Sequence, residues 1–127
     1  DELWGGRTVG NQIGFERTRI DIGFADKEQF DARSLQEKVN ELIAGGGAVT
    51  MGFNPRAELL DDPLVRVNMD LIPAHIDMLR VITIDGVDIC PCAGTHVGDI
   101  SKIGPLEVTR VRSKGAGKLR VEYILVD

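Results

Sequence analysis

The sequence has few aromatic residues and cysteines, and it contains no long hydrophobic run. Aromatics make up only 5% of the 127 residues, so valine, isoleucine and leucine must fill most of the core. No apolar stretch approaches the roughly 20 residues that a membrane-spanning helix needs, so we expect no association with a membrane. No basic start followed by an apolar segment indicates a signal peptide. The length and the lack of repeats or linkers predict one domain over residues 1–127.

The two cysteines, Cys90 and Cys92, are separated by a single residue. That spacing is unfavourable for a disulfide, so we expect free thiols or thiolate ligands. Free cysteines are typical of a reducing compartment, and the sequence therefore predicts a cytoplasmic protein.

The net charge of −5 argues against indiscriminate binding to nucleic acid, but the basic residues are unevenly distributed. Residues 102–127 hold 6 basic and 3 acidic side chains, whereas residues 1–101 hold 9 basic and 17 acidic ones. Within the basic segment, Arg110, Arg112 and Lys114 are candidates for binding a phosphate backbone. The alternative is an ordinary solvated face of a sheet.

Hydrophobic periodicity in the first third of the chain predicts two strands followed by a helix. Residues 7–13 and 17–24 are expected to be short strands, because apolar and polar residues alternate in the second of them. Residues 35–44 place their apolar side chains at helical spacing. Ser34 is the expected N-cap, and Glu37 completes a capping box.

The middle and the end of the chain predict further strands, a second helix and two hairpins. The triple glycine at 45–47 should end the first helix, and residues 48–53 should return as a strand. Asn54 and Pro55 are expected to start a short helix over 55–61, and residues 62–77 show no clear period. The expected hairpins join 79–84 to 87–90 through Asp85-Gly86, and 106–112 to 119–126. The sum is an α+β fold with a mainly antiparallel sheet, one longer helix and one short helix.

The segment richest in chemistry follows the strand predicted to end at Cys90. Cys92 and His96 are separated by three residues in the string CAGTH, and thiolate and imidazole are both good zinc ligands. One cysteine and one histidine make only half of a tetrahedral site. By spacing alone, a packing cysteine beside an ordinary histidine is the stronger reading.

The longer string ICPCAGTHV at 89–97, followed by IGPL at 103–106, resembles a family signature. It is similar to the C-G-G-T-H-V signature of the editing domains of alanyl-tRNA synthetases and of their free-standing relatives. The glutamine and arginine segments at 10–14 and 17–21, and the V-N-E-L-I helix at 39–43, also resemble this family. So do the R-V-I segment at 80–82 and the R-V-E-Y segment at 120–123.

The resemblance implies a zinc-dependent aminoacyl-tRNA deacylase with the threonyl/alanyl-tRNA synthetase editing fold. Its substrate would be seryl- or glycyl-tRNA(Ala), its partner the acceptor end of that tRNA, and ATP binding would belong to a parent synthetase. Cys92 and His96 would be zinc ligands. Gln12 matches a glutamine near the family's editing pocket, and Thr95 lies between the ligands, so both are candidate catalytic residues. For Thr95 the alternative is a threonine that stabilises the turn.

Two departures from the family pattern bear on activity. Ala93 replaces a glycine, and the H-x-x-x-H motif that would supply two more zinc ligands does not occur in residues 1–127. We expect the missing motif on a helix upstream of residue 1. The vacant ligand positions could otherwise involve His75 or Cys90, although a surface histidine and a core thiol are the simpler readings. An alternative function is a metal-free binding module that keeps the editing fold without catalysis.

Overall fold

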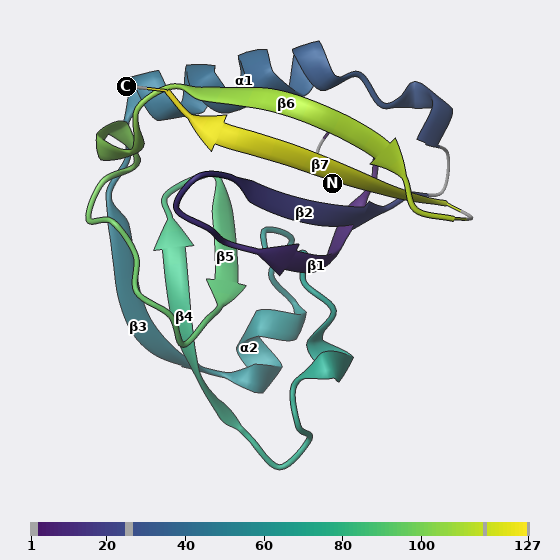
Figure 1. Cartoon of the computed structure of the whole chain (residues 1–127). Coiled ribbons are helices and arrows are strands. Elements are labelled where there is room, and N and C mark those ends of the chain that lie inside the picture. Colours follow the sequence, from purple (N-terminus) through teal and green to yellow (C-terminus); the bar gives the residue numbers. More distant parts are fainter. Residues whose placement is uncertain (1–2, 25–26, 116, 127) are drawn as a thin grey trace. The chain divides into compact units, whose positions relative to one another are not determined.

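The structure, a computed structural model, describes residues 3–24, 27–115 and 117–126. The chain divides into two compact units, Asp1–Gly45 with Ile103–Asp127, and Gly46–Lys102. We call them unit 1 and unit 2. Each unit contains one antiparallel sheet, and one long and one short α-helix accompany them (Figure 1). The α+β prediction with mainly antiparallel strands and two helices is confirmed.

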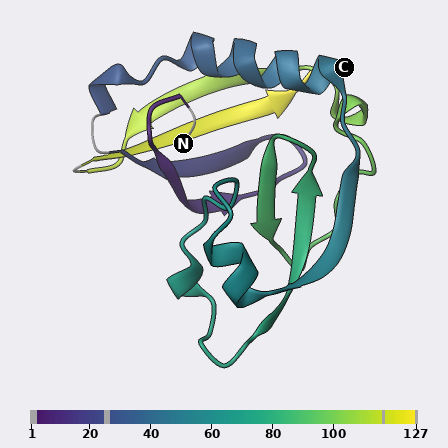
Figure 2. The same cartoon turned by 180° about the vertical axis from the view of Figure 1, so that it is seen from behind.

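Unit 1 is built on a four-stranded sheet with a long helix along one face. Its strands lie in the order β1 (Arg7–Gln12), β2 (Thr18–Gly23), β7 (Lys118–Leu125) and β6 (Leu106–Ser113). The helix α1 (Ala32–Gly45) runs along β6 and β7, as the views from both sides show (Figures 1 and 2). The strands predicted at both ends of the chain are confirmed.

The apolar face of this sheet and α1 form the core of unit 1. Ile43 of α1 and Leu119 and Val121 of β7 are buried, and Val121 is only 1% exposed. Two amide side chains of α1 also satisfy the backbone of the edge strand β6. Asn40 donates to the carbonyl of Leu106 and accepts from its amide, both at 2.8 Å, and Gln36 accepts from the amide of Val108. The helix thus covers the sheet and completes the hydrogen bonds of its edge.

The first turn of α1 differs from the prediction. The helix begins at Ala32, and the carboxylate of Asp31 accepts hydrogen bonds from the amide and the hydroxyl of Ser34. Those bonds hold the pKa of Asp31 below its usual value. Ser34 is therefore not the N-cap. Glu37 instead pairs with Arg33 one turn earlier, at 3.0 Å. An aspartate three residues earlier fulfils the same need for an acceptor at the free amides of the helix start.

Unit 2 contains a three-stranded sheet in the order β3 (Val49–Pro55), β4 (Met78–Ile84) and β5 (Asp88–Pro91). The short helix α2 (Arg56–Leu60) follows β3 directly. A buried cluster formed by Leu59, Met69, Leu79 and Val81 is the core of this unit. Three 3₁₀ turns complete the chain's regular elements among the described residues, at Lys27–Gln29, Met69–Leu71 and Ile100–Ile103.

Two local predictions in unit 2 are corrected. Asn54 belongs to β3, and Pro55 occupies the N-cap position of α2 without a side-chain cap. In the β4–β5 turn only Gly86 has a positive φ, +70°, whereas Asp85 does not. The amide of Val87 donates to the carbonyl of Ile84, so the turn closes with a single left-handed residue.

The irregular segment predicted at 62–77 is held by one arginine. The guanidinium of Arg56 donates to the carbonyls of Met69, Ile72, Pro73 and Ile76 at distances between 2.6 and 3.2 Å. The carbonyls of Met69 and Pro73 also accept one backbone amide each, and Arg56 adds a side-chain donor to all four carbonyls of this largely irregular segment.

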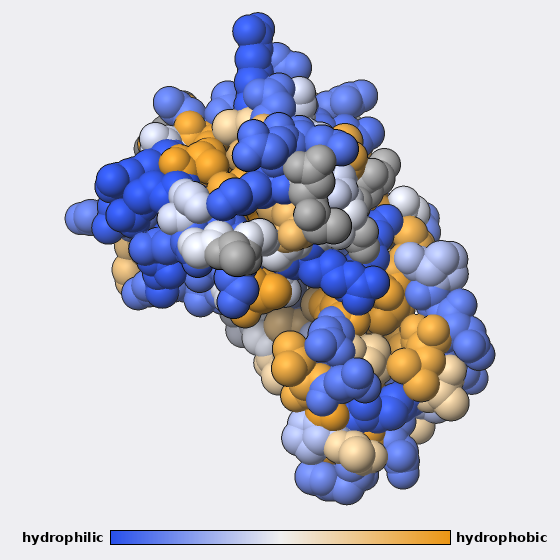
Figure 3. Space-filling model, turned by 90° about the vertical axis from the view of Figure 1, so that its right-hand side faces the viewer, coloured by the Kyte–Doolittle hydropathy of each residue, from blue (hydrophilic) through white to orange (hydrophobic). Residues whose placement is uncertain are grey.

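Apolar side chains also reach the surface, where they alternate with polar ones on the face seen in Figure 3. The exposed large ones include Ile13 and Phe15 in unit 1 and Phe53 and Leu71 in unit 2. Among the described residues, no helix is both long and apolar enough to span a membrane.

Candidate functional site

The Cys–His loop, residues 92–96, begins where β5 ends and is anchored on both sides within unit 2. The amide of Cys92 donates to the carbonyl of Arg80 on the neighbouring strand β4. After the loop, the amide of Val49 donates to the carbonyl of Gly98 at 3.0 Å. Next to it, the carboxylate of Asp99 accepts from the amides of Gly47 and Ser101. The loop therefore connects two points fixed to the same sheet.

The side chain of Arg80 holds the loop from within. Its Nη1 donates to the carbonyl of Cys92 at 2.6 Å and to that of Gly94 at 3.0 Å. Arg80 is only partly exposed, so these charged hydrogen bonds form in partial shelter from water. The sequence indicated Arg80 as a family position but gave no sign that its partner is the Cys–His loop.

The loop presents one sulfur and one ring nitrogen that suit a metal. Cys92 Sγ accepts a hydrogen bond from the amide of Gly94 at 3.5 Å. His96 Nδ1 lies 3.1 Å from the carbonyl of Gly94. A carbonyl only accepts, so Nδ1 carries the proton and Nε2 of the neutral ring keeps its lone pair for a ligand. His96 is exposed and Cys92 half-buried, so both atoms are accessible.

The other candidate ligands do not join this pair in the part of the chain that the structure describes. Those residues bring no three His, Cys, Asp or Glu side chains together as a metal-binding group. Cys90 is a free thiol whose pKa is raised by burial, and its sulfur donates to the carbonyl of Pro91. His75 lies exposed in the segment held by Arg56. The donor set thus fits a zinc ion at two ligand positions, Cys92 and His96.

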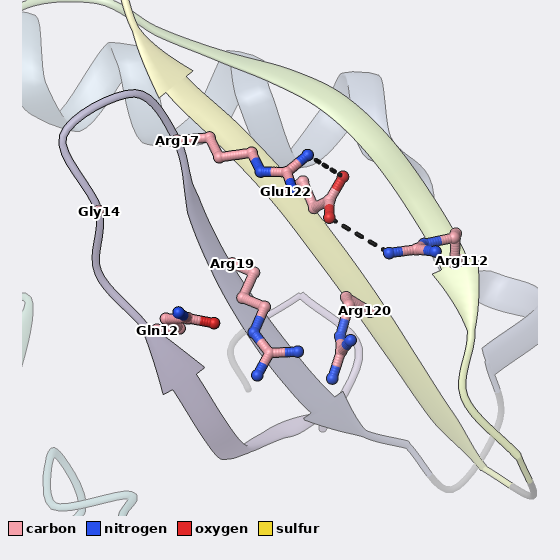
Figure 4. Close-up of a pocket in the computed structure, with 7 residues that line it drawn as sticks. All are labelled: Gln12, Gly14, Arg17, Arg19, Arg112, Arg120 and Glu122. Atoms are coloured by element: carbon pink, nitrogen blue, oxygen red, sulfur yellow. Dashed lines mark hydrogen bonds and ion pairs between the residues drawn. The ribbon is translucent and has the colours of Figure 1, made fainter.

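Gln12, the other residue singled out by the resemblance, lies in unit 1, on the sheet face opposite α1. It lines a pocket of about 210 Å³, which we call the arginine pocket. The side chain of Gln12 points from the end of β1 toward Arg19 on β2, and β7 and β6 complete the floor (Figure 4). The residues lining the pocket are Gln12, Gly14, Arg17, Arg19, Arg112, Arg120 and Glu122.

Glu122 is the negative centre of the arginine pocket. It is only 5% exposed and pairs with Arg112 at 3.3 Å and with Arg17 at 3.9 Å (Figure 4). Arg120 pairs with Asp21 at 2.8 Å, and its guanidinium holds the pKa of Asp21 below the usual value. Strand pairing places Asp21 opposite Arg120 and brings Glu122 within reach of Arg17, so both ion pairs join segments far apart in the sequence.

The remaining predicted site residues belong to different units. Thr95 is exposed in the Cys–His loop of unit 2, whereas the predicted nucleic-acid-binding residues belong to unit 1. Of these, Arg112 lines the arginine pocket, and Arg110 and Lys114 are exposed. Arg120 and Glu122 lie on the face of β7 opposite the buried Leu119 and Val121, as alternation along a strand requires. The alternation of the last strand was the signal that located them.

Comparison with known proteins assigns residues 79–122 to the family described as Threonyl and Alanyl tRNA synthetase second additional domain. The matched segment contains β4, β5, the Cys–His loop and β6, and it ends within β7 at Glu122. The chain belongs to this editing-domain family. The matched segment thus includes Arg80, both candidate ligands and the arginines of β6 and β7.

Individual relatives extend the likeness to nearly the whole chain. An alanine–tRNA ligase of Desulforudis audaxviator is 46% identical over 91% of this chain, which covers 13% of the ligase. The alanyl-tRNA editing protein AlaX-M of Methanosarcina barkeri is 28% identical over 97% of the chain, which covers 51% of that protein. The alanyl-tRNA editing protein Aarsd1 of Danio rerio is 31% identical over 98% of the chain and 30% of its own length. The chain therefore spans about half the length, or less, of these relatives.

Proposed function

We propose that this chain forms part of an aminoacyl-tRNA deacylase. The reaction is hydrolysis of the ester between a misplaced serine or glycine and the 3′-terminal adenosine of tRNA(Ala). The observation that carries the proposal is the Cys–His loop, whose donor atoms Cys92 Sγ and His96 Nε2 are left available inside the family segment. The printed names of the relatives, alanyl-tRNA editing protein and alanine–tRNA ligase, point to the same tRNA.

Cys92 and His96 would supply two ligands of a zinc ion. When bound, zinc lowers the pKa of a coordinated water and polarises a carbonyl, which is the chemistry that ester hydrolysis needs. The chain's own residues set the geometry. Arg80 fixes the backbone on either side of Ala93, and the hydrogen bond from Nδ1 to Gly94 orients the imidazole.

Two polar side chains would contact the substrate. Thr95 presents an exposed hydroxyl between the two ligands, suited to a hydrogen bond with the ester or with the hydroxyl of serine. Gln12 presents an exposed carboxamide at the arginine pocket, and a carboxamide can both donate to a carbonyl oxygen and accept from an ammonium or hydroxyl group. Arg110, Arg112 and Lys114 would contact the backbone of the tRNA acceptor end, and the setting would be the cytoplasm.

The deciding experiment measures release of serine from seryl-tRNA(Ala) by the zinc-loaded protein, with alanyl-tRNA(Ala) as the correctly charged comparison. We expect Cys92→Ser and His96→Asn to abolish release and to lower the bound zinc measured by mass spectrometry. Cys90→Ser is the matched control and should leave both unchanged, because its thiol points to Pro91.

Failure of the zinc-loaded protein to hydrolyse seryl-tRNA(Ala) would reject the proposal. The competing function, a metal-free binding module, predicts a different pattern. It requires that aminoacyl-tRNA binding survive both substitutions and the removal of metal by a chelator, without any release of serine.

A further inference from the structure

We propose that the arginine pocket binds a phosphodiester of a single-stranded RNA end, and that Phe15, in the β1–β2 turn between two pocket residues, stacks on a neighbouring base. The proposal deepens the proposed function, on which it rests for the identity of the RNA. It concerns binding by unit 1 alone and involves neither zinc nor the Cys–His loop.

The first support is the charge of the pocket. Four arginines line it, with Glu122 as the single acidic lining residue. Glu122 is shared between Arg17 and Arg112, and Arg120 is paired with Asp21. Arg19 makes no ion pair or hydrogen bond with the side chains described, although its charge contributes to the lowered pKa of Asp21, and Figure 4 shows it beside Arg120. Even when the carboxylates of Glu122 and Asp21 are both counted against the four arginines, the site keeps an excess of positive charge that favours an anion.

The second support is a pair of unsatisfied donors. The Nε–H groups of Arg19 and Arg112 are buried and have no hydrogen-bond acceptor within the described chain. Buried donors are almost always satisfied in folded proteins, so two of them beside one pocket indicate an absent acceptor. A phosphate offers several oxygens to the planar donor fork of arginine, which is the geometry that arginine binds best.

The third support concerns what else the ligand carries. The pocket volume of about 210 Å³ is several times the roughly 30 Å³ that a water molecule takes in the liquid. The pocket can therefore hold a group larger than a single carboxylate. The β1–β2 turn holds Phe15 fully exposed, between the pocket residues Gly14 and Arg17. Proteins hold single-stranded nucleic acid by combining a cationic groove with exposed aromatic rings, because an unpaired base can stack on such a ring. Bases in a duplex are already stacked, so the geometry favours a single strand.

The test is fluorescence anisotropy with a 5′-labelled, deacylated single-stranded hexanucleotide RNA and the complete chain in the presence of a chelator. We expect Arg19→Gln to weaken binding about tenfold and to reduce the slope of log K against log salt by about 0.7, as expected for one lost phosphate contact. Phe15→Ala should weaken binding about tenfold with the salt slope unchanged. Arg33→Gln is the control, because Arg33 is exposed on α1, pairs with Glu37 and does not line the pocket, and it should change affinity less than twofold.

Competitors distinguish the possible sources of the anion. Inorganic phosphate at millimolar concentration should displace the RNA from the native chain, and an RNA duplex of equal length should bind at least tenfold more weakly. Equal loss of affinity in Arg19→Gln and Arg33→Gln would overturn the pocket as the binding site. Tight binding of a polyglutamate peptide that is insensitive to Phe15→Ala would assign the pocket to an acidic protein partner instead.

Circular dichroism checks that Arg19→Gln is folded. Arg19→Lys serves as the second variant, since it keeps the charge and removes the donor fork, and it should weaken binding about threefold. Because the RNA carries no aminoacyl ester and the buffer no free metal, failure here leaves the deacylase proposal intact. Loss of serine release with normal RNA binding would reject the deacylase proposal and leave the RNA-binding pocket intact.

Discussion

The arginine pocket and the Cys–His loop are held in place by different forces. Side chains in the pocket are positioned by one another, through the pairs of Glu122 with two arginines and of Asp21 with Arg120. The loop is positioned through its backbone, because Arg80 and the neighbouring strands bind its carbonyls and amides. Ion pairs between side chains depend on pH and salt, whereas hydrogen bonds to backbone carbonyls depend mainly on the donor's shape. The two regions should therefore respond differently to the same perturbations.

The largest effect is expected at the buried acid of the pocket. Replacing Glu122 with Gln leaves Arg17 and Arg112 without their counter-charge while Arg19 and Arg120 stay nearby. Breaking a fully buried pair costs about 3–5 kcal/mol; because Arg17 is well exposed, we expect about 2–3 kcal/mol here. Urea unfolding measures the loss, with the exposed Glu107→Gln on β6 as the control. An equal effect of the two substitutions would show that Glu122 is not the electrostatic centre of the pocket.

The second prediction concerns the loop. Replacing Arg80 with Met removes two hydrogen bonds to the carbonyls of Cys92 and Gly94 and should lower stability by about 2 kcal/mol. It should also weaken zinc binding about tenfold or more, as for other groups that orient metal ligands. Competition with a chromogenic chelator measures the affinity. Arg66→Met is the control in the same unit, because it removes a hydrogen bond to the carbonyl of Val87 and a pair with Asp88 at 4.0 Å, both outside the Cys–His loop. If Arg80→Met bound zinc as tightly as the Arg66→Met control, Arg80 would not position the zinc ligands.

A pH series sharpens the contrast further. Because Arg120 lowers the pKa of Asp21 in the folded chain, the pair contributes stability that is fully present above the ordinary aspartate value of 3.8. That contribution is lost as the pH falls through the lowered folded value. The stability difference between the native chain and Asp21→Asn should thus be greatest near neutral pH and vanish in acid. Arg80→Met should show a difference from the native chain that changes little over the same range.

The smallest effect is expected outside both regions. Arg110 is exposed on β6 and lies outside the arginine pocket, so Arg110→Gln should change stability by less than about 0.5 kcal/mol. It should also weaken RNA binding less than Arg19→Gln does in the anisotropy assay. A larger loss of RNA affinity in Arg110→Gln than in Arg19→Gln would show that the nucleic acid binds at the edge of the sheet and not in the pocket.

Local sequence rules located most elements of both units but misplaced several of their ends. Alternation predicted β2 and β7, and helical spacing with the glycines at 45–47 predicted α1. The capping box at Ser34 and Glu37 was wrong, because Asp31 was an equally good acceptor nearer the true start. Capping rules identify the type of residue that precedes the first turn of a helix, and several residues within one turn can meet the same rule.

The candidate sites were predictable only where their chemistry lies in a continuous string. Cys92, Thr95 and His96 are neighbours in sequence, so the motif alone located the loop. The partners of Arg17 and Arg120 were not predictable, because Glu122 and Asp21 reach them through strand pairing between segments about 100 residues apart. No local pattern encodes that register.

By itself the sequence determined the α+β class, the family resemblance and the pair of metal-binding side chains, since each depends on residue type and short spacing. Only the tertiary structure decided that Arg80 binds the Cys–His loop and that four arginines surround one buried glutamate. The physical reason is that strand pairing sets which distant side chains share a face. A guanidinium or carboxylate then takes whichever partner the register brings within hydrogen-bonding distance.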